Sequence, residues 1–281
     1  MARDPVRVLL FENFDNVALP TSMPLKASLP HSLGFESTQV WIELVDDPKE
    51  CFGGSGRSLK ATYPSISRDE ALYPWSGFDL RPYNTDHVYI RFRARMTKAR
   101  HGLKFVKVFG QREEDNYANT TFGLDYTGVE SGFGSLYCVS YGDGSEIAND
   151  TANVILLGGG GNIGRAESLP GLSVETPQHK AFSSSDWSTS WHRFEFYVKF
   201  NSGKSAGTEK NDGEVAVKID DKVYVEAKGL YNRHYSNKLI DRIEILGWTQ
   251  TARGVRTPEF EVWYDDIEIS LNGWLDRSGG H

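Results

Sequence analysis

The stretch WHRFEFYVKF, residues 191–200, decides the fold class of this chain. If the stretch is extended, one side carries His192, Phe194, Phe196, Val198 and Phe200, and the other carries Trp191, Arg193, Glu195, Tyr197 and Lys199. Such a period of two is typical of a β-strand with one buried face. A helix would scatter the phenylalanines around its circumference. We therefore predict a strand whose apolar side contributes to a core.

A second stretch, VYIRFRARM at residues 88–96, repeats this alternation. Its apolar side carries Val88, Ile90, Phe92, Ala94 and Met96, and its polar side carries Tyr89, Arg91, Arg93 and Arg95. Shorter segments separated by turn-rich spacers predict further strands at residues 6–11, 39–44, 58–63, 103–109, 121–126, 135–141, 153–157, 214–219, 222–227, 242–248 and 260–271. No stretch carries an amphipathic helix of three turns, so we expect an all-β chain.

Two pairs of aspartates predict local features of these strands. Asp220 and Asp221 lie between two strand segments and suit a tight hairpin, because short polar residues adopt turn dihedrals. Within residues 260–271 the apolar parity shifts across Asp265 and Asp266, which predicts a β-bulge. Antiparallel strands that are polar on one face pack as two sheets of a sandwich. We predict a single domain over residues 1–281, with a short irregular tail at 272–281.

Composition excludes several classes of protein. The chain has 281 residues with 31 Lys+Arg against 38 Asp+Glu, a net charge of −7, and so lacks the basic field that meets nucleic acid. No apolar run approaches the roughly 20 residues that cross a bilayer, so we expect no membrane partner. Two cysteines are too few for a disulfide scaffold. The first residues, MARDPVRVLLFENFDN, show no secretory signal, which leaves two localisations open: use without export, or secretion followed by loss of a leader.

The carboxy-terminal third carries a family resemblance. Its strands occur in an order marked by Trp191, Asp212-Gly213, Asp220-Asp221 and Asp265-Asp266. Over residues 191–271 this order resembles the concanavalin A-like jelly rolls of polysaccharide lyases and laminin G-like domains. The resemblance implies a β-jelly-roll sandwich of two antiparallel sheets. The short catalytic signatures of the alginate lyases with this fold are not intact here, so no catalytic residue is carried over by position.

Polar residues on two strands predict a groove for an acidic glycan. The candidate substrate-binding residues are Arg91, Arg93, Arg95, Arg193, Tyr197 and Lys199, provided that both strands lie on the concave sheet. Proton transfer in a lyase suits His and Tyr, which makes Tyr231, His234 and Tyr235 the candidate catalytic residues. The alternative is that the alternating charges form the wet face of an antiparallel sheet and pair across strands.

A structural calcium ion is a further expectation, because jelly rolls of this type often hold one where the first and last strands meet. Glu12 follows the first predicted strand, and Asp265 and Asp266 interrupt the last. These hard oxygen ligands suit Ca²⁺, which takes 6–8 of them. The alternative is that the two aspartates only shape a bulge.

Two functions follow from these observations. The first is recognition of a polysaccharide, an acidic glycan by preference, with cleavage of a uronate-containing chain by β-elimination as its enzymatic form. The second is a non-enzymatic bacteriophage virion protein, a capsid decoration or tail-associated subunit, that serves glycan adhesion or assembly. The absence of an export signal favours the second, and the resemblance to lyases favours the first.

Overall fold

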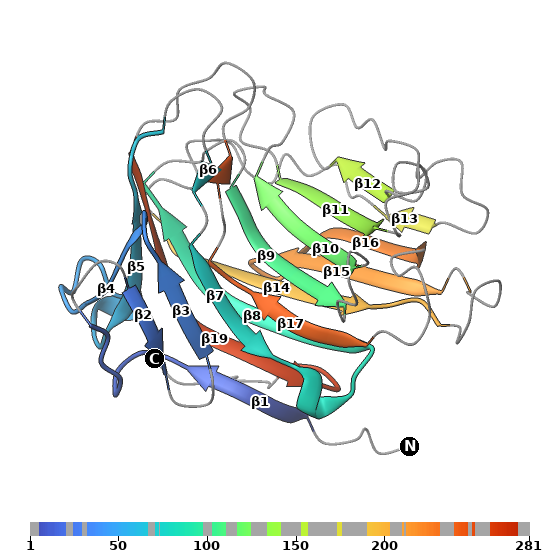
Figure 1. Ribbon diagram of the computed structural model, residues 1–281, viewed down its shortest axis with the longest axis horizontal. Coiled ribbons are helices and arrows are strands. Elements are labelled where there is room, and N and C mark those ends of the chain that lie inside the picture. The colour runs from blue at the N-terminus through green and yellow to red at the C-terminus, as the bar shows by residue number, and fades with distance from the viewer. Residues whose placement is uncertain are drawn as a thin grey trace.

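The structure is a computed structural model that describes residues 6–20, 25–29, 33–66, 71–72, 74–97, 103–110, 117–124, 134–141, 153–156, 173–175, 190–202, 210, 212–230, 239–246, 249–250 and 259–274. Antiparallel strands dominate these ranges (Figure 1). Their helices are two short 3-10 turns, η2 (Phe52–Gly54) and η3 (Arg81–Tyr83). Within the same ranges, no helix is long and apolar enough to cross a membrane.

Sheet A has nine strands, in the order β13-β16-β15-β14-β8-β19-β5-β4, with β1 paired to β19. Their bounds are β13 (Ser173–Glu175), β16 (Lys222–Leu230), β15 (Gly213–Ile219), β14 (His192–Lys199), β8 (His87–Met96), β19 (Phe260–Leu271), β5 (Ser58–Tyr63), β4 (Trp41–Val45) and β1 (Arg7–Glu12). The predicted strands over residues 88–96 and 191–200 thus become neighbours, β8 and β14, in the middle of one sheet.

Sheet B has eight strands, in the order β12-β11-β10-β9-β17-β7-β3-β2. Their bounds are β12 (Asn153–Leu156), β11 (Gly134–Tyr141), β10 (Tyr117–Leu124), β9 (Leu103–Gly110), β17 (Ile240–Glu244), β7 (Trp75–Asp79), β3 (Leu33–Ser37) and β2 (Leu25–Ser28). A separate short pair joins β18 (Thr249–Gln250) to β6 (Ala71–Leu72). Because strands distant in sequence are neighbours in both sheets, each half of the chain contributes to each layer.

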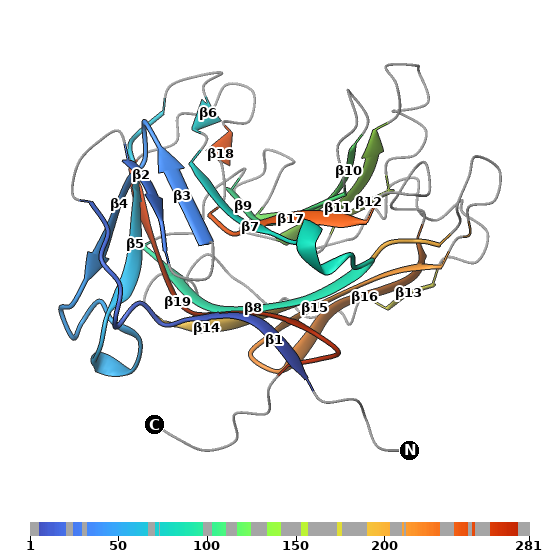
Figure 2. The ribbon, with the colours of Figure 1, turned by 60° about the horizontal axis from the view of Figure 1, so that its bottom comes forward.

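The two sheets form stacked layers that curve in the same direction (Figure 2). Sheet B lies on the inner side of this curve and sheet A on the outer side. All the pairings within both sheets are antiparallel among the described strands. The predicted fold, an all-β jelly-roll sandwich of two antiparallel sheets, is confirmed.

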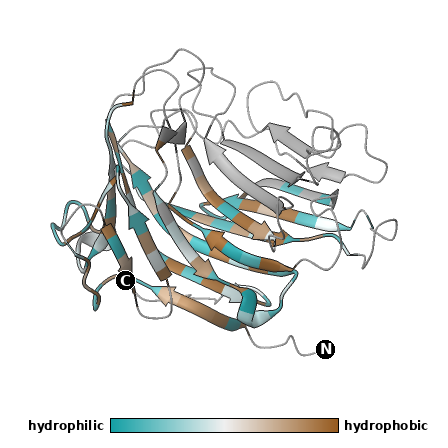
Figure 3. Ribbon diagram, viewed as in Figure 1, coloured by the Kyte–Doolittle hydropathy of each residue, from teal (hydrophilic) through white to brown (hydrophobic). Residues whose placement is uncertain are grey.

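The core lies between the layers and contains the residues that the alternation predicted. Phe92 and Phe194 of sheet A stack with ring centroids 5.4 Å apart, and Phe105 of sheet B lies 5.3 Å from Phe194. The buried sides of β8 and β14 consist of Val88, Ile90, Phe92, Ala94, Met96, Phe194, Phe196 and Val198. Alternating apolar and polar positions follow the described strands (Figure 3). Burial stabilises the fold by about 1.5–3 kcal/mol for each such large side chain.

The two aspartate pairs adopt the predicted local conformations. Asp220 and Asp221 have φ values of 49° and 67°, so both residues of this two-residue hairpin turn are left-handed, as tight hairpins require. In β19 the register to β8 shifts between Asp265 and Glu268, and Asp266 has a φ of 48°. An aspartate tolerates this left-handed conformation better than a branched residue would. Both the hairpin and the bulge are confirmed.

The strand predicted over residues 242–248 differs from the structure. It begins earlier, and β17 ends at Glu244. The backbone N–H groups of Ile245 and Leu246 both donate to the Ser76 hydroxyl oxygen, at 3.1 and 2.6 Å. Because these donors are bound by a side chain, they are not available to a sheet ladder, and the chain leaves the sheet there.

Candidate functional site

The six predicted glycan-binding residues lie on the outer layer of the sandwich. They are Arg91, Arg93 and Arg95 on β8, with Arg193, Tyr197 and Lys199 on β14. In register, Arg93 lies opposite Arg193 and Arg91 lies opposite Glu195, so the structure brings most of the set together on one face. That face belongs to sheet A, whereas the groove was expected on the concave sheet, which is sheet B.

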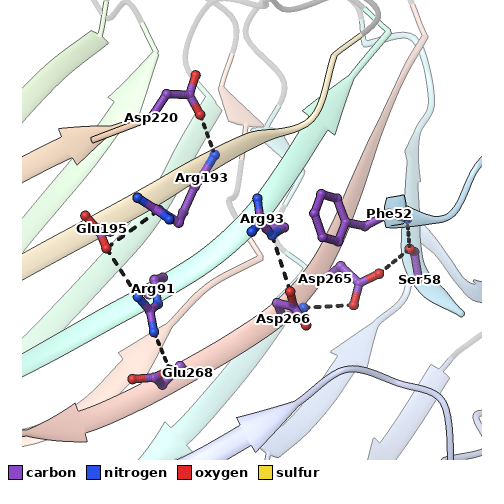
Figure 4. A network of polar contacts seen from close by, with 10 residues as sticks. All are labelled: Phe52, Ser58, Arg91, Arg93, Arg193, Glu195, Asp220, Asp265, Asp266 and Glu268. Atoms are coloured by element: carbon purple, nitrogen blue, oxygen red, sulfur yellow. Dashed lines mark hydrogen bonds and ion pairs between the residues drawn. The ribbon is translucent and has the colours of Figure 1, made fainter. Parts of the chain in front are cut away.

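Carboxylates pair with three of these four arginines, and Arg91 and Arg193 share one of the carboxylates (Figure 4). The Arg91 Nη2 lies 2.8 Å from the Glu268 Oε2, and its Nη1 lies 3.5 Å from the Glu195 Oε1. Arg193 pairs with Asp221 at the hairpin turn, and its Nε lies 3.7 Å from the same Glu195 oxygen. Glu268 is only 1% exposed, so its charge depends on Arg91 for compensation.

Arg93 and Arg95 make aromatic contacts. The Arg93 guanidinium lies 3.9 Å from the centre of the Phe52 ring, and its Nε lies 3.3 Å from the Asp266 Oδ2. The Arg95 guanidinium lies over the Trp263 ring at 4.3 Å and near the Trp191 ring at 5.6 Å. Burial lowers the pKa of Arg95 from its usual value. Arg93 thus packs against η2, and Arg95 packs against two tryptophan rings on the same face of sheet A.

Tyr197 and Lys199 are also engaged by neighbours. The Tyr197 ring lies 4.6 Å from that of Tyr89, and burial strongly raises the pKa of the Tyr197 hydroxyl. The Lys199 Nζ lies 3.0 Å from the Glu214 Oε1, and this hydrogen bond raises the pKa of Lys199. The outer face therefore shows the cross-strand charge pairing that the sequence left open as an alternative. A role of these six residues in glycan binding stays a prediction.

The predicted catalytic residues Tyr231, His234 and Tyr235 lie outside the described residues.

The predicted calcium ligands take part in internal hydrogen bonds. The Phe14 N–H donates to the Glu12 Oε1 at 2.7 Å. The Ser58 hydroxyl donates to the Asp265 Oδ2 at 2.6 Å, and the Asp266 N–H donates to the Asp265 Oδ1 at 2.8 Å. Burial raises the pKa of Asp265 to about 7. Across the described ranges, no three His, Cys, Asp or Glu side chains gather closely enough to hold a metal ion. The ion stays a prediction.

A different cluster lies on sheet B, where β9 and β17 run side by side. Glu244 lies opposite Lys107 in register, and Arg242 lies opposite Phe109. The Arg242 Nε lies 3.2 Å from the Glu244 Oε1. Both cations lie near the Phe109 ring. The Arg242 guanidinium is 4.5 Å and the Lys107 Nζ is 5.6 Å from the ring centre. We call Lys107, Phe109, Arg242 and Glu244 the inner-sheet cluster.

A β-bulge places this lysine on the inner side of the curve. The β9–β10 register shifts beside Phe105, so that Val106 and Lys104 are paired but Phe105 is not. Phe105 packs into the core, and Val106 and Val108 are also buried. Lys107, between the two valines, lies on the opposite face. Bulges commonly redirect side chains next to functional sites.

The protonation of Lys107 is shifted toward the neutral amine. Lys107 is 9% exposed, and this burial lowers its pKa from 10.5 to about 8. The charge of Glu244 acts in the opposite direction and raises the pKa, whereas Arg242 lowers it further. An amine with a pKa near 8 is partly neutral under physiological conditions and can accept a proton.

The cluster therefore combines a proton acceptor with an exposed cation. The Arg242 side chain is 42% exposed and can meet an anionic group, while Glu244 is 14% exposed. Sequence reasoning missed these residues because the strand at 103–109 was considered only for its apolar pattern. The signal was present in that strand, since Lys107 lies between two valines and phenylalanines in FVKVF. A lysine within such a run is costly unless its position has a function or a partner.

No protein-family model matches the sequence, and a comparison with curated proteins finds no match. Solved structures do match. A variant of alginate lyase Aly36B in complex with an alginate trisaccharide is 14% identical, covers 94% of this chain and 97% of its own, and has a TM-score of 0.50. The endo-β-1,4-glucuronan lyase of the fungus Trichoderma reesei is 13% identical, covers 95% of each chain, and also has a TM-score of 0.50.

A third similar structure is the carbohydrate esterase vb_24B_21 of the Shiga toxin-encoding bacteriophage phi24B. It is 16% identical and covers 96% of this chain and 100% of its own, with a TM-score of 0.43. Identities this low show a shared fold alone. The chain has a jelly-roll fold similar to that of the alginate and glucuronan lyases.

Proposed function

We propose that the protein is a polysaccharide lyase that cleaves an acidic, uronate-containing glycan by β-elimination at the inner-sheet cluster. The observation that supports this most is the pairing of a lysine whose pKa is about 8 with an exposed arginine on neighbouring strands of the inner sheet. The shared fold with alginate and glucuronan lyases is compatible with it.

Elimination from a 4-linked uronate makes three chemical demands. A base removes the C5 proton, the C4–O bond breaks as the C4–C5 double bond forms, and the departing oxygen takes up a proton. Neutral Lys107 is the base in this proposal. The Arg242 guanidinium pairs with the uronate carboxylate, which makes the C5 proton more acidic by stabilising the charge that develops next to it.

The proton for the leaving oxygen needs a separate donor. Tyr231, His234 and Tyr235 are the predicted candidates for this role.

The test is the unsaturated product. Alginate, glucuronan and heparin-like chains should be offered in turn, and cleavage raises the absorbance near about 235 nm as the new double bonds form. We expect Lys107→Met and Arg242→Met each to slow this increase by at least about a hundredfold. Lys26→Met is the matched control, because Lys26 is an exposed lysine of the same sheet that pairs with Glu36 at 3.5 Å.

An absence of cleavage would favour the second function, a non-enzymatic glycan-adhesion or assembly protein. If no uronate polymer is cleaved by the unaltered protein while glycan binding persists, the non-catalytic alternative takes its place. That alternative is glycan adhesion or assembly in a virion, with virion or self-assembly partners. Symmetric assembly in solution would support it, and a monomer that cleaves one of the polymers would contradict it.

A further inference from the structure

Glu244 is the member of the inner-sheet cluster that adjoins both of its cations. It is opposite Lys107 in the β17–β9 register and lies 3.2 Å from the Arg242 Nε through its Oε1. Its side chain is 14% exposed, against 42% for Arg242, so the carboxylate lies deeper than the guanidinium that it holds. Glu244 therefore lies beneath Arg242 and beside the buried Lys107.

We infer that Glu244 is a positioning residue that fixes the Arg242 guanidinium over Phe109 and acts on the Lys107 amine from the neighbouring strand. The inference rests on the proposed function for its role in catalysis, but the coupling itself is a property of the protein without substrate.

The geometric part of this role concerns Arg242. The ion pair engages Nε, the guanidinium nitrogen nearest the backbone, so the two terminal nitrogens can donate together to a carboxylate. Stacking on Phe109 at 4.5 Å limits rotation about the remaining side-chain bonds. Without Glu244, the partly exposed guanidinium loses the contact that orients it.

The electrostatic part concerns Lys107. Burial and Arg242 favour the neutral amine, and Glu244 favours the ammonium form. At the paired backbone positions of the described strands, Thr121 of β10 lies opposite Lys107, and Gly77 of β7 lies opposite Glu244. Asp79 lies opposite Arg242 and pairs with Arg81 at 2.7 Å. Glu244 is therefore a carboxylate on the neighbouring strand that favours the ammonium form of Lys107.

The experiment measures Lys107 directly in the folded protein without substrate. Reductive methylation with ¹³C-formaldehyde labels the lysine amines, and NMR follows each one against pH, with the Lys107 signal identified by its absence from Lys107→Met. In Glu244→Gln we expect the Lys107 midpoint to fall by about half a pH unit or more. Glu36→Gln is the matched control, because it removes an exposed carboxylate of the same sheet and should leave the midpoint unchanged.

The outcomes separate the inference from the proposed function. An unchanged Lys107 midpoint in folded Glu244→Gln overturns the inference, whatever the activity. A lowered midpoint in a protein that cleaves no uronate polymer supports the coupling and removes the lyase. If the Lys107 midpoint falls and the unaltered protein cleaves a uronate polymer, two further changes are expected in Glu244→Gln. The pH profile of kcat/KM should shift to lower pH, and KM should rise at least threefold because Arg242 loses its orientation. Should Glu244→Gln not fold, Glu244→Asp withdraws the carboxylate by one methylene, and an unchanged midpoint there overturns the inference equally.

Discussion

Phe105 and Lys107 lie two residues apart on β9, yet they lie on opposite faces of sheet B. Phe105 packs 5.3 Å from Phe194 across the core, whereas Lys107 lies 5.6 Å from the Phe109 ring on the inner side of the curve. In a regular strand, residues two apart share a face. The register shift at Phe105 places the two side chains on opposite faces, so that one strand contributes to the core and to the candidate site.

Replacing Phe105 tests the core side of that relationship. We expect Phe105→Ala to lower the free energy of unfolding by about 3–5 kcal/mol, because it leaves a cavity between two stacked rings. Denaturant unfolding followed by tryptophan fluorescence measures the change. Trp41→Phe, at a side chain that is 38% exposed, serves as the comparison and should change stability by less than about 1 kcal/mol.

Replacing Lys107 tests the site. We expect Lys107→Met to reduce kcat by about 10²–10⁴-fold, the range attributed to general acid–base groups. The far-ultraviolet circular dichroism should stay that of the unaltered β-sandwich, since methionine fills a similar volume. A variant that retains more than a tenth of the activity would exclude Lys107 as the base.

Activity should depend on pH through the same amine. The Lys107 pKa is about 8, and only the neutral form accepts a proton, so kcat/KM should rise about tenfold per unit below pH 7 and level off above about pH 9. Initial rates measured at constant ionic strength over this pH range provide the measurement. A profile that falls between pH 7 and 9 would be inconsistent with a lysine base.

Stability should respond to pH at this residue as well. The pKa of Lys107 is about 8 in the folded chain against 10.5 as its ordinary value, so the unfolded chain binds more protons between these limits. The free energy of unfolding therefore gains from Lys107 as the pH rises from 8 to 10.5, by at most about 3 kcal/mol. Lys107→Met should remove this increase, and unaltered slopes in the two proteins would contradict the lowered pKa.

The outer face makes a separate prediction. Arg91→Met leaves Glu268, which is 1% exposed, without its 2.8 Å partner, and we expect a loss of about 3–5 kcal/mol of unfolding free energy. Glycan affinity at temperatures where the variant stays folded should change by less than twofold if the site is on sheet B. A tenfold weaker binding of an acidic glycan would instead establish the predicted groove on sheet A.

The sequence predicts the layers well because alternation is a local property. Phe194 and Phe196 are buried as expected, and the left-handed aspartates at 220 and 266 follow from residue type and parity. The site was not predictable in the same way. Lys107 reaches the inner face through a one-residue bulge, and its neighbour Glu244 is 137 positions later in sequence (244 − 107). Strand order, which no local pattern specifies, also decides that Arg91 and Arg193 lie on the outer sheet.

The pairing of β1 with β19 has a consequence for synthesis. Arg7 lies beside Leu271, and β19 separates β8 from β5 in the centre of sheet A. During synthesis, β1 therefore leaves the ribosome long before its pairing partner β19 has been made. Until β19 is made, the edge of β8 that pairs with it stays open, and open strand edges of this kind favour self-association.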